Sequence, residues 1–278
     1  MNPIQAIVLG VVEGLTEFLP VSSTGHLTIV EKLLGLTVDD PGVTAFTAII
    51  QVGAIIAVIL YFRQDIGRLI AAWVRGFTSR EARQDPAWRM AWLVIVGTIP
   101  VGVVGLAARH VIEGPLRSLW VVAAALVGWS VVMYVAERVG RKQRAEADLR
   151  VGDAVVIGLM QCFALIPGVS RSGATISAGL FRGLDRVSAT RFAFLLSIPA
   201  LVAAGGFEAA TSASAISSSV GWLATGIATV VSFIVGYASI AWLLRLVAHH
   251  PISVFIWYRV ALAIVLVVLL TTGVITAV

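Results

Sequence analysis

Long apolar segments, separated by short arginine-rich stretches, most restrict how this chain can fold. Six of them are long enough, at about 20 residues, to cross the ~30 Å hydrocarbon core of a bilayer as helices. They are residues 44–62, 88–108, 118–136, 189–207, 220–246 and 252–278. Only 13% of the 278 residues are charged, against about 25% in a soluble domain. The sequence therefore predicts one polytopic all-α membrane domain and excludes a soluble globule. No aromatic–basic face indicates a nucleic-acid partner.

Two further apolar segments are interrupted by turn-forming residues. Residues 3–19 stop at a break rich in Pro, Ser and Gly, residues 20–26, and apolar residues resume as far as residue 36. Residues 151–166 stop at a similar break, residues 167–173, and resume as far as residue 184. Each half is short for a bilayer span, so each segment is predicted to form a re-entrant helical hairpin. Two kinked helices that do cross the membrane are the alternative.

The basic residues indicate the orientation, because lysine and arginine are enriched on the cytoplasmic side of membrane proteins. Fourteen of the 20 basic residues lie in residues 63–89, 137–150 and 182–191, whereas residues 208–219 contain none. The first three stretches are therefore predicted to lie inside, and residues 208–219 to form an outside loop. This arrangement requires both hairpins to return to the side they entered and both chain ends to lie outside.

The two interrupted segments also align with each other at an offset of 148 residues. The identical pairs are Ala6/Ala154, Val8/Val156, Gly10/Gly158, Val21/Val169, Ser22/Ser170 and Gly25/Gly173. We therefore predict a repeat, residues 1–148 and residues 149–278, in which each copy has one hairpin and three spans. Because three is odd, the second copy is inverted, an architecture that places a binding site where the two broken elements meet.

Charged side chains within the apolar segments indicate where this site lies, since each costs ~2.5–3.5 kcal/mol to insert. Glu13 and Glu17 share one helix face, His26 lies in the first break, and Arg171 lies in the second. Two carboxylates in a low-dielectric site need a proton, an arginine or a cation, and carboxylate oxygens suit Mg²⁺ or Ca²⁺. Glu13 and Glu17 are therefore predicted metal ligands. A Glu–Arg pair that only fixes helix packing is the alternative.

The breaks also carry groups that suit phosphate. Each opens a helix whose free N–H groups favour an anion, and the planar fork of Arg171 matches phosphate oxygens. Ser23 and His26 lie three residues apart, and a hydroxyl beside an imidazole is a pairing that activates a nucleophile. The predicted substrate contacts, some of which also cap helices, are Ser22, Thr24, Gly25, Ser170, Ser172, Gly173 and Thr175.

At these residues the sequence resembles a known family. Residues 13–26, Glu-Gly-Leu-Thr-Glu-Phe-Leu-Pro-Val-Ser-Ser-Thr-Gly-His, resemble the first signature of the bacterial undecaprenyl-diphosphate phosphatases of the bacitracin-resistance type. Residues 167–175, Pro-Gly-Val-Ser-Arg-Ser-Gly-Ala-Thr, resemble the second. The resemblance extends across the whole chain. It implies an inner-membrane enzyme that hydrolyses undecaprenyl diphosphate to the monophosphate and inorganic phosphate, which recycles the lipid carrier for cell-wall synthesis. It also implies a divalent cation, a periplasmic catalytic opening and a homodimer.

The resemblance assigns the family's functional residues to Glu13, Glu17, Ser23, His26 and Arg171. In the predicted mechanism Ser23 attacks the terminal phosphorus with His26 as general base. Arg171, helix N-termini and a metal held by the glutamates neutralise the phosphate oxygens. Direct attack by His26 or by a metal-activated water is the alternative. A secondary transporter or a lipid-phosphate flippase is the alternative function, since inverted repeats with broken helices are also typical of transporters.

Overall fold

Helices form nearly all of the fold in a computed structural model of the chain, which describes residues 1–38, 40–113, 116, 118–218 and 220–277, with backbone only at 113 and 207–218. Six helices in this part of the chain are long and apolar enough to cross a membrane. They are α3 (Pro41–Tyr61), α5 (Pro86–Ala107), α7 (Leu119–Val139), α10 (Arg186–Ser218), α11 (Trp222–His249) and α12 (Val254–Thr271). The predicted all-α polytopic fold and its six spans are confirmed.

The structure corrects three boundaries. Residues 63–89, the stretch between the first two predicted spans, contain the amphipathic helix α4 (Arg63–Gly76). Its arginines make the segment resemble a loop, although its buried apolar positions follow a helical spacing. Residues 208–219, predicted as an outside loop, are helical up to Ser218, since this stretch contains no Pro or Gly to end α10. Finally, α12 ends at Thr271 rather than at residue 278, because Gly273 (φ 72°) turns the chain away.

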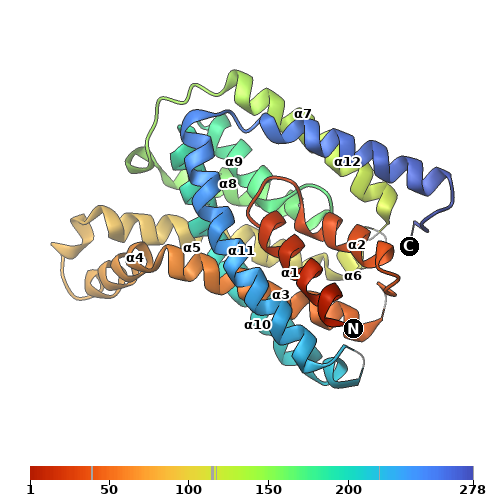
Figure 1. The fold of residues 1–278 in the computed structure, drawn as a ribbon. Helices are drawn as coiled ribbons and strands as arrows, with labels where there is room; N and C mark the ends of the chain where they lie inside the picture. The colour runs from red at the N-terminus through yellow and green to blue at the C-terminus, as the bar shows by residue number, and fades with distance from the viewer. Residues whose placement is uncertain (39, 114–115, 117, 219, 278) are drawn as a thin grey trace.

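Both interrupted segments form helix–break–helix hairpins. The first is α1 (Pro3–Thr16) and α2 (Ser23–Leu33), and the second is α8 (Val151–Gln161), η4 (Cys162–Leu165) and α9 (Arg171–Phe181). The start of α1 lies beside the end of α2, as a hydrogen bond of 3.2 Å from the Gln5 side chain to the Leu34 carbonyl shows. Likewise Arg182, after α9, donates to Asp153 near the start of α8 at 2.7 Å. Each segment therefore doubles back on itself, which favours hairpins over kinked spans, while their re-entrant course in the membrane stays a prediction. Figure 1 shows both chain ends at the right, away from α4.

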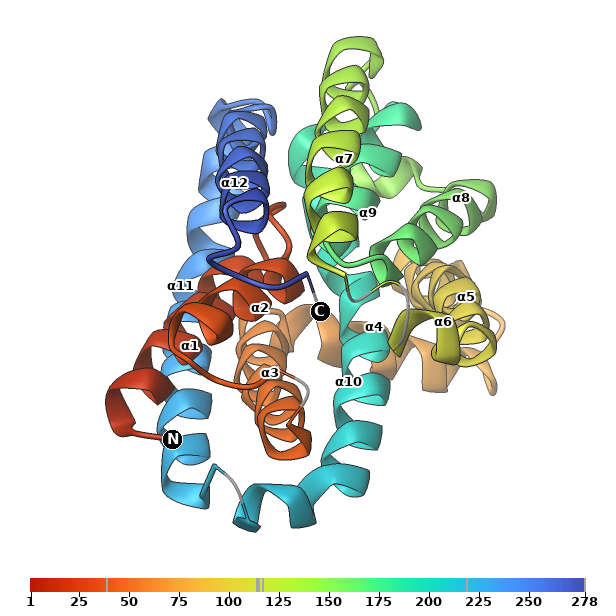
Figure 2. The same ribbon diagram turned by 90° about the vertical axis from the view of Figure 1, so that its right-hand side faces the viewer.

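The two hairpins pack in corresponding ways. Helix α1 packs on α11 and α8 packs on α5, with each hairpin against a span of the other half of the chain (Figure 2). A Cβ atom at Gly10 would lie 2.6 Å from the Ala228 carbonyl oxygen, and one at Gly158 would collide with the backbone of Gly97. Only glycine allows these backbones to approach so closely. This matched packing supports the repeat of residues 1–148 and 149–278, which stays a prediction.

Short elements complete the arginine-rich side of the molecule. They are η1 (Ala82–Gln84) and η3 (Glu146–Asp148), while α6 (Arg109–Glu113) follows α5 at its other end. Here the buried Asp153 carboxylate accepts from Arg144 at 2.6 Å and from Arg182 at 2.7 Å. Burial alone would raise the pKa of Asp153, but the hydrogen bonds from both guanidinium groups and from the Arg150 N–H outweigh it and lower this pKa to about 2. The carboxylate therefore ties the two ends of the second hairpin together.

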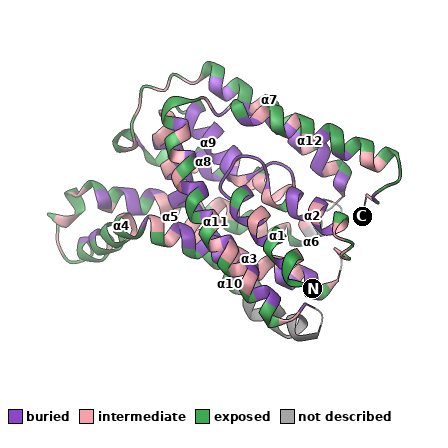
Figure 3. Ribbon diagram, in the orientation of Figure 1, coloured by how far each residue is buried: buried purple, intermediate pink, exposed green. Residues whose placement is uncertain are grey.

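Buried residues collect where the two breaks meet, as Figure 3 shows. All residues of α9 from Ser172 to Leu180 are buried, and Phe18, just before the first break, is fully buried. Exposed apolar side chains, such as Val131 on α7 and Val268 on α12, lie instead on the outer faces of the helices. Outer apolar faces suit lipid, whereas the polar residues of the breaks, such as Ser22 and Ser170, are buried in the protein.

Candidate active site

The two breaks have the same backbone geometry. Ser22 and Ser170 have φ angles of 77° and 78°, a left-handed region that non-glycine residues rarely adopt. Each hydroxyl accepts from the N–H three residues later, that of Gly25 at 3.5 Å and that of Gly173 at 3.2 Å. Both serines therefore cap the helices that follow, which sets the direction of each helix N-terminus.

The breaks also contact each other directly. The Gly168 N–H donates to the Ser22 hydroxyl at 3.0 Å, and the Ser170 hydroxyl donates to the Leu19 carbonyl at 3.4 Å. These bonds join residues 146 and 151 positions apart in the sequence. The structure thus brings the two breaks together, as predicted.

A fully buried arginine, which sequence analysis missed, links both breaks from α12. Arg259 donates to the Pro20 carbonyl at 3.0 Å and to the Gly168 carbonyl at 2.9 Å. It also donates to the Ser130 hydroxyl at 3.1 Å and, at longer distances, to two α7 carbonyls. Its position in the apolar segment 252–278 was a signal for it, since an intramembrane charge indicates function by default. Arg259 fixes the position of one break relative to the other.

Glu17 is the centre of the polar contacts at the breaks. Its Oε1 accepts from Arg171 Nη2 at 2.8 Å and from Gln51 Nε2 at 3.4 Å. Its Oε2 accepts from the Ser23 hydroxyl at 2.5 Å. The carboxylate therefore lies where it can remove the proton of Ser23, while the guanidinium of Arg171 stabilises its charge. Side chains from both breaks thus form one constellation.

His26 does not contact Ser23 in the way predicted. Its Nδ1 donates to the Ser22 carbonyl at 2.7 Å, so the Nε2 of the neutral ring accepts from the Tyr258 hydroxyl at 2.6 Å. The His26 and Tyr258 rings are stacked, with centroids 5.5 Å apart. The backbone carbonyl one helical turn earlier holds the imidazole, so Ser23 instead pairs with Glu17. Tyr258 is the second site residue that sequence analysis missed.

A cavity of about 670 Å³ lies beside this constellation. Polar side chains of α1, α2 and α3 line one part of it: Glu13, Ser23, Thr24, Thr28, Glu31, Lys32, Thr44, Thr47 and Gln51. The residues that α7, the second hairpin and α10 contribute are apolar: Val122, Ala164, Leu165, Pro167 and Ala204. Arg109 and Ala277, near the ends of spans, also line the cavity. The lining of the cavity therefore has a polar part and an apolar part, as expected of a site that binds an amphiphilic molecule.

The other predicted substrate contacts do not line the cavity. Ser170 and Ser172 bond to each other at 3.1 Å, and the Thr175 hydroxyl donates to the Arg171 carbonyl at 2.8 Å. Ser22, Gly25, Ser170, Ser172, Gly173 and Thr175 are all buried. In this structure these residues build the breaks, whereas Ser23 and Thr24 contact the open space.

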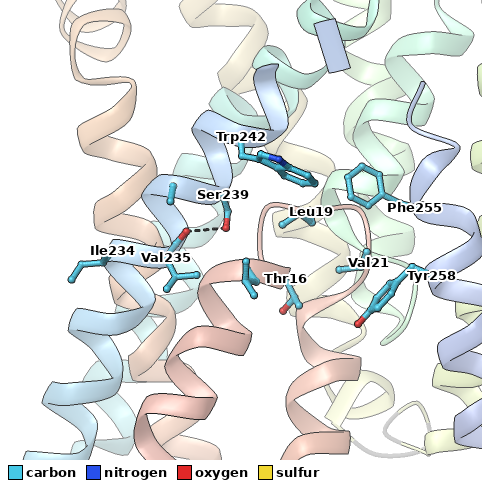
Figure 4. Close-up of a pocket in the computed structure, with 11 residues that line it drawn as sticks. Thr16, Leu19, Val21, Ile234, Val235, Ser239, Trp242, Phe255 and Tyr258 are labelled. Atoms are coloured by element: carbon cyan, nitrogen blue, oxygen red, sulfur yellow. Dashed lines mark hydrogen bonds between the residues drawn. The ribbon is translucent and has the colours of Figure 1, made fainter. Parts of the chain in front are cut away.

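An apolar groove of about 780 Å³ lies on another face of the first break (Figure 4). Figure 4 shows Ser239 and Trp242 of α11 along one wall, Leu19 and Val21 of the break in the middle, and Phe255 and Tyr258 of α12 along the other wall. The groove and the polar cavity share no lining residue. Tyr258 connects the groove to His26.

The two predicted metal ligands, Glu13 and Glu17, differ in whether their carboxylate oxygens already accept hydrogen bonds. Both oxygens of Glu17 accept hydrogen bonds, whereas Oε1 of the buried Glu13 has no hydrogen-bond partner in the described part of the chain. Those described residues contain no group of three or more His, Cys, Asp or Glu side chains arranged to hold a metal ion. Glu13 therefore suits a cation that is otherwise held by water and substrate oxygens, as Mg²⁺ often is.

Comparison with known proteins agrees with this geometry. The sequence model of the bacitracin resistance protein BacA family matches residues 6–265. The chain belongs to this family. It is 58% identical over 277 residues to Undecaprenyl-diphosphatase 3 of Frankia casuarinae, with 100% of both chains covered. It is 55% identical over 278 residues to an undecaprenyl-diphosphatase of Acidothermus cellulolyticus, and 48% identical over 280 residues to one of Mycobacterium sp. (strain KMS), again with 100% of each chain covered. The family resemblance inferred from residues 13–26 and 167–175 is confirmed.

Proposed function

We propose that this protein is an undecaprenyl-diphosphatase, a membrane hydrolase that converts undecaprenyl diphosphate to undecaprenyl phosphate and inorganic phosphate. This activity recycles the lipid carrier for cell-wall synthesis and gives bacitracin resistance. The supporting observation is the Ser23 hydroxyl, which lines the cavity and lies 2.5 Å from a carboxylate that also binds Arg171. A transporter needs no such activated hydroxyl.

The cavity suits a lipid diphosphate because the two parts of its lining differ. The diphosphate would lie along the polar part, near the helix N-terminus at Ser23 and the guanidinium of Arg171. The isoprenoid chain would leave over the apolar part, which includes Val122, Leu165 and Ala204. Burial of that chain against apolar side chains provides affinity without competing with the reacting phosphate.

In the proposed reaction the Ser23 oxygen attacks the terminal phosphorus while Glu17 takes the hydroxyl proton. The bond between that phosphorus and the bridging oxygen breaks, and undecaprenyl phosphate leaves. Water then hydrolyses the phosphoserine and releases inorganic phosphate. Arg171 neutralises the phosphoryl oxygens throughout. His26 is less suited to act as nucleophile or base, because both ring nitrogens already have partners; it holds the first turn of α2.

A divalent cation, Mg²⁺ or Ca²⁺, is part of the proposal, with Glu13 as a ligand. When bound, it would neutralise diphosphate oxygens that Arg171 alone leaves charged. The buried Oε1 of Glu13, which has no hydrogen-bond partner among the described residues, supports this assignment. Removing the cation with a chelator should therefore abolish phosphate release, and adding Mg²⁺ or Ca²⁺ should restore it.

We also propose that the cavity faces the periplasmic side of the inner membrane. Arg109 and Ala277, which line it, lie at span ends that the distribution of basic residues assigns to the outside. Both termini lie outside in the same assignment, which cysteine labelling of intact cells would test. A homodimer is proposed from the family resemblance, and the mass of the protein–detergent complex tests it.

Phosphate release from undecaprenyl diphosphate by the purified, detergent-solubilised protein with Mg²⁺ tests the proposed function. Ser23→Ala and Arg171→Met should lose at least about 10³-fold in rate, the scale of a lost nucleophile or phosphate clamp. Ser79→Ala, in the stretch after α4, is the matched control. Acid quenching should trap phosphate on Ser23. Folded protein that moves the lipid between leaflets but releases no phosphate would instead identify a flippase.

A further inference from the structure

Helix α4 leaves an apolar stripe exposed on the arginine-rich side of the molecule. The helix packs on α5, and its residues Leu69 and Ala72 are buried. Ile70 and Val74 of α4 and Phe77, which follows it, are instead each more than half exposed. Because residues spaced by four and three positions lie on one face of a helix, these three form a continuous stripe, which we call the α4 stripe. An exposed apolar patch of this kind marks a surface for a membrane or a partner.

Arg68 and Arg75 form a basic edge beside the α4 stripe. Both are exposed, and they lie two helical turns apart, so they project from the same side of α4. Arg68 lies 3.9 Å from Asp65, and Arg75 donates from Nε to the Ala71 carbonyl at 3.2 Å. The Asp65 carboxylate also accepts from Arg191 of α10 at 3.0 Å. Because this acidic residue of α4 is paired with α10, the exposed side of the helix is positively charged.

The α4 stripe adjoins the outer face of α5. The Phe77 ring lies edge-on to that of Trp88 with centroids 5.4 Å apart, and the centroids of Trp73 and Trp92 are 5.9 Å apart. Trp92 and Ile99 of α5 are exposed, and α5 is one of the helices long and apolar enough to cross a membrane. Tryptophan is enriched where a span meets the membrane–water interface. The α4 stripe is thus joined to a surface that suits lipid.

We propose that α4 lies in the cytoplasmic interface of the membrane and binds anionic phospholipids there. Its stripe enters the edge of the hydrocarbon, and Arg68 and Arg75 contact lipid phosphates. A helix with one apolar and one basic face is typical of helices that lie in this interface. The distribution of basic residues assigns residues 63–89 to the cytoplasmic side. That leaflet is negatively charged and attracts basic segments next to a span, so the charges of the helix and the lipid are complementary.

A second copy of the chain fits this surface less well than lipid does. Two copies related by a two-fold axis would place the same surface patch against itself. Arg68 and Arg75 of one copy would then approach those of the other, and like charges across an interface repel. Anionic lipid, in contrast, neutralises both guanidinium groups. The inference is independent of the proposed function, because none of the described residues that line the polar cavity belongs to α4.

Fluorescence quenching by brominated lipids tests the proposal in the full-length protein, reconstituted into vesicles of equimolar phosphatidylglycerol and phosphatidylcholine. A bimane fluorophore is attached to Val74→Cys in a Cys162→Ser background, since Cys162 is the only cysteine in the sequence. Bromine quenches at short range and is placed on the acyl chains of one lipid or of the other. The ratio of the two quenching efficiencies measures the preference for anionic lipid beside α4.

With both arginines present, this ratio should favour phosphatidylglycerol by about fivefold or more, the scale of the attraction of one arginine to an anionic leaflet. Arg68→Gln combined with Arg75→Gln should bring the ratio to within about twofold of one. Arg245→Gln, at the exposed end of α11, is the matched control and should keep the preference. Thermal unfolding in detergent confirms that each variant is folded.

Three kinds of result would overturn the proposal. If neither brominated lipid quenches the fluorophore, residue 74 does not contact the bilayer. If Val74→Cys chains form a disulfide-linked dimer in the vesicles, a second copy covers the α4 stripe instead of lipid. If both lipids quench equally before the arginines are replaced, or if the preference survives their replacement, the helix contacts the bilayer without binding anionic headgroups through Arg68 and Arg75.

Discussion

Replacing Arg259 with methionine tests whether the two breaks must be held together for activity. Arg259 does not line the cavity, yet it donates to one carbonyl in each break, those of Pro20 and Gly168. Methionine fills a similar volume without any donor. After the substitution, the hydrogen bonds of Ser22 and Ser170 and the ion pair between Arg171 and Glu17 still join the two segments.

The expected effect on stability is smaller than the effect on activity. A hydrogen bond from a charged donor contributes ~1.5–3 kcal/mol, so the two shortest carbonyl contacts of Arg259 amount to ~3–6 kcal/mol. The guanidinium pays several kcal/mol for burial, which methionine avoids, so the net change in the free energy of unfolding should stay within about 2 kcal/mol. A displacement of about 1 Å between Arg171 and Ser23, in contrast, costs roughly 10²-fold in rate.

We therefore expect kcat of Arg259→Met to fall about 100-fold with little change in KM, since the substrate-lining residues remain. Phosphate release from undecaprenyl diphosphate gives both constants, and thermal unfolding in detergent monitors the fold. Arg259→Lys should recover part of kcat, because an ammonium reaches some of the same carbonyls. Arg245→Met, at the exposed end of α11, is the control. Folded Arg259→Met with wild-type kcat would refute the idea that this residue positions the breaks.

Three further substitutions follow from the same contacts. Glu17→Gln keeps the shape of the side chain but cannot take a proton, so phosphate release should fall ~10²–10⁴-fold. Tyr258→Phe removes the hydroxyl group that donates to His26 Nε2. The pH–rate profile should then show a titration of the His26 imidazole between about pH 5 and 8. An unchanged profile would mean that the contact only packs the two rings. The pKa of Asp153 is about 2, below its ordinary value of 3.8, so this carboxylate stabilises the fold above about pH 4 and loses that effect as the pH falls through 2. Asp153→Asn should therefore cost about 2 kcal/mol at pH 7, measured by thermal unfolding, and almost nothing at pH 2.

Several features of the fold were predictable because they depend on local sequence. Length and hydropathy alone determine a membrane span, so all six spans were predicted. Most of their predicted ends lie within a few residues of the ends of the helices. The breaks were predictable because Pro20, Gly168 and the serines beside them interrupt apolar runs. Helix α4 was missed because its basic residues resemble those of a loop, although its apolar positions follow a helical period.

The composition of the site was only partly predictable. Buried charge identified Glu13, Glu17 and Arg171, since an apolar segment carries such groups at a cost. The same rule applied to Arg259, but its segment looked like an ordinary span.

Sequence by itself thus determined which segments enter the membrane, where they break and which charged residues they carry. Only the tertiary structure decided the partners of those residues: Ser23 with Glu17, and His26 with Tyr258, which lies 232 positions away. The physical reason is that helix formation and membrane insertion depend on neighbouring residues, whereas a hydrogen bond depends on which side chains packing brings within about 3 Å. Spacing places Ser23 and His26 on one helix face, but it does not determine which acceptor each of them meets.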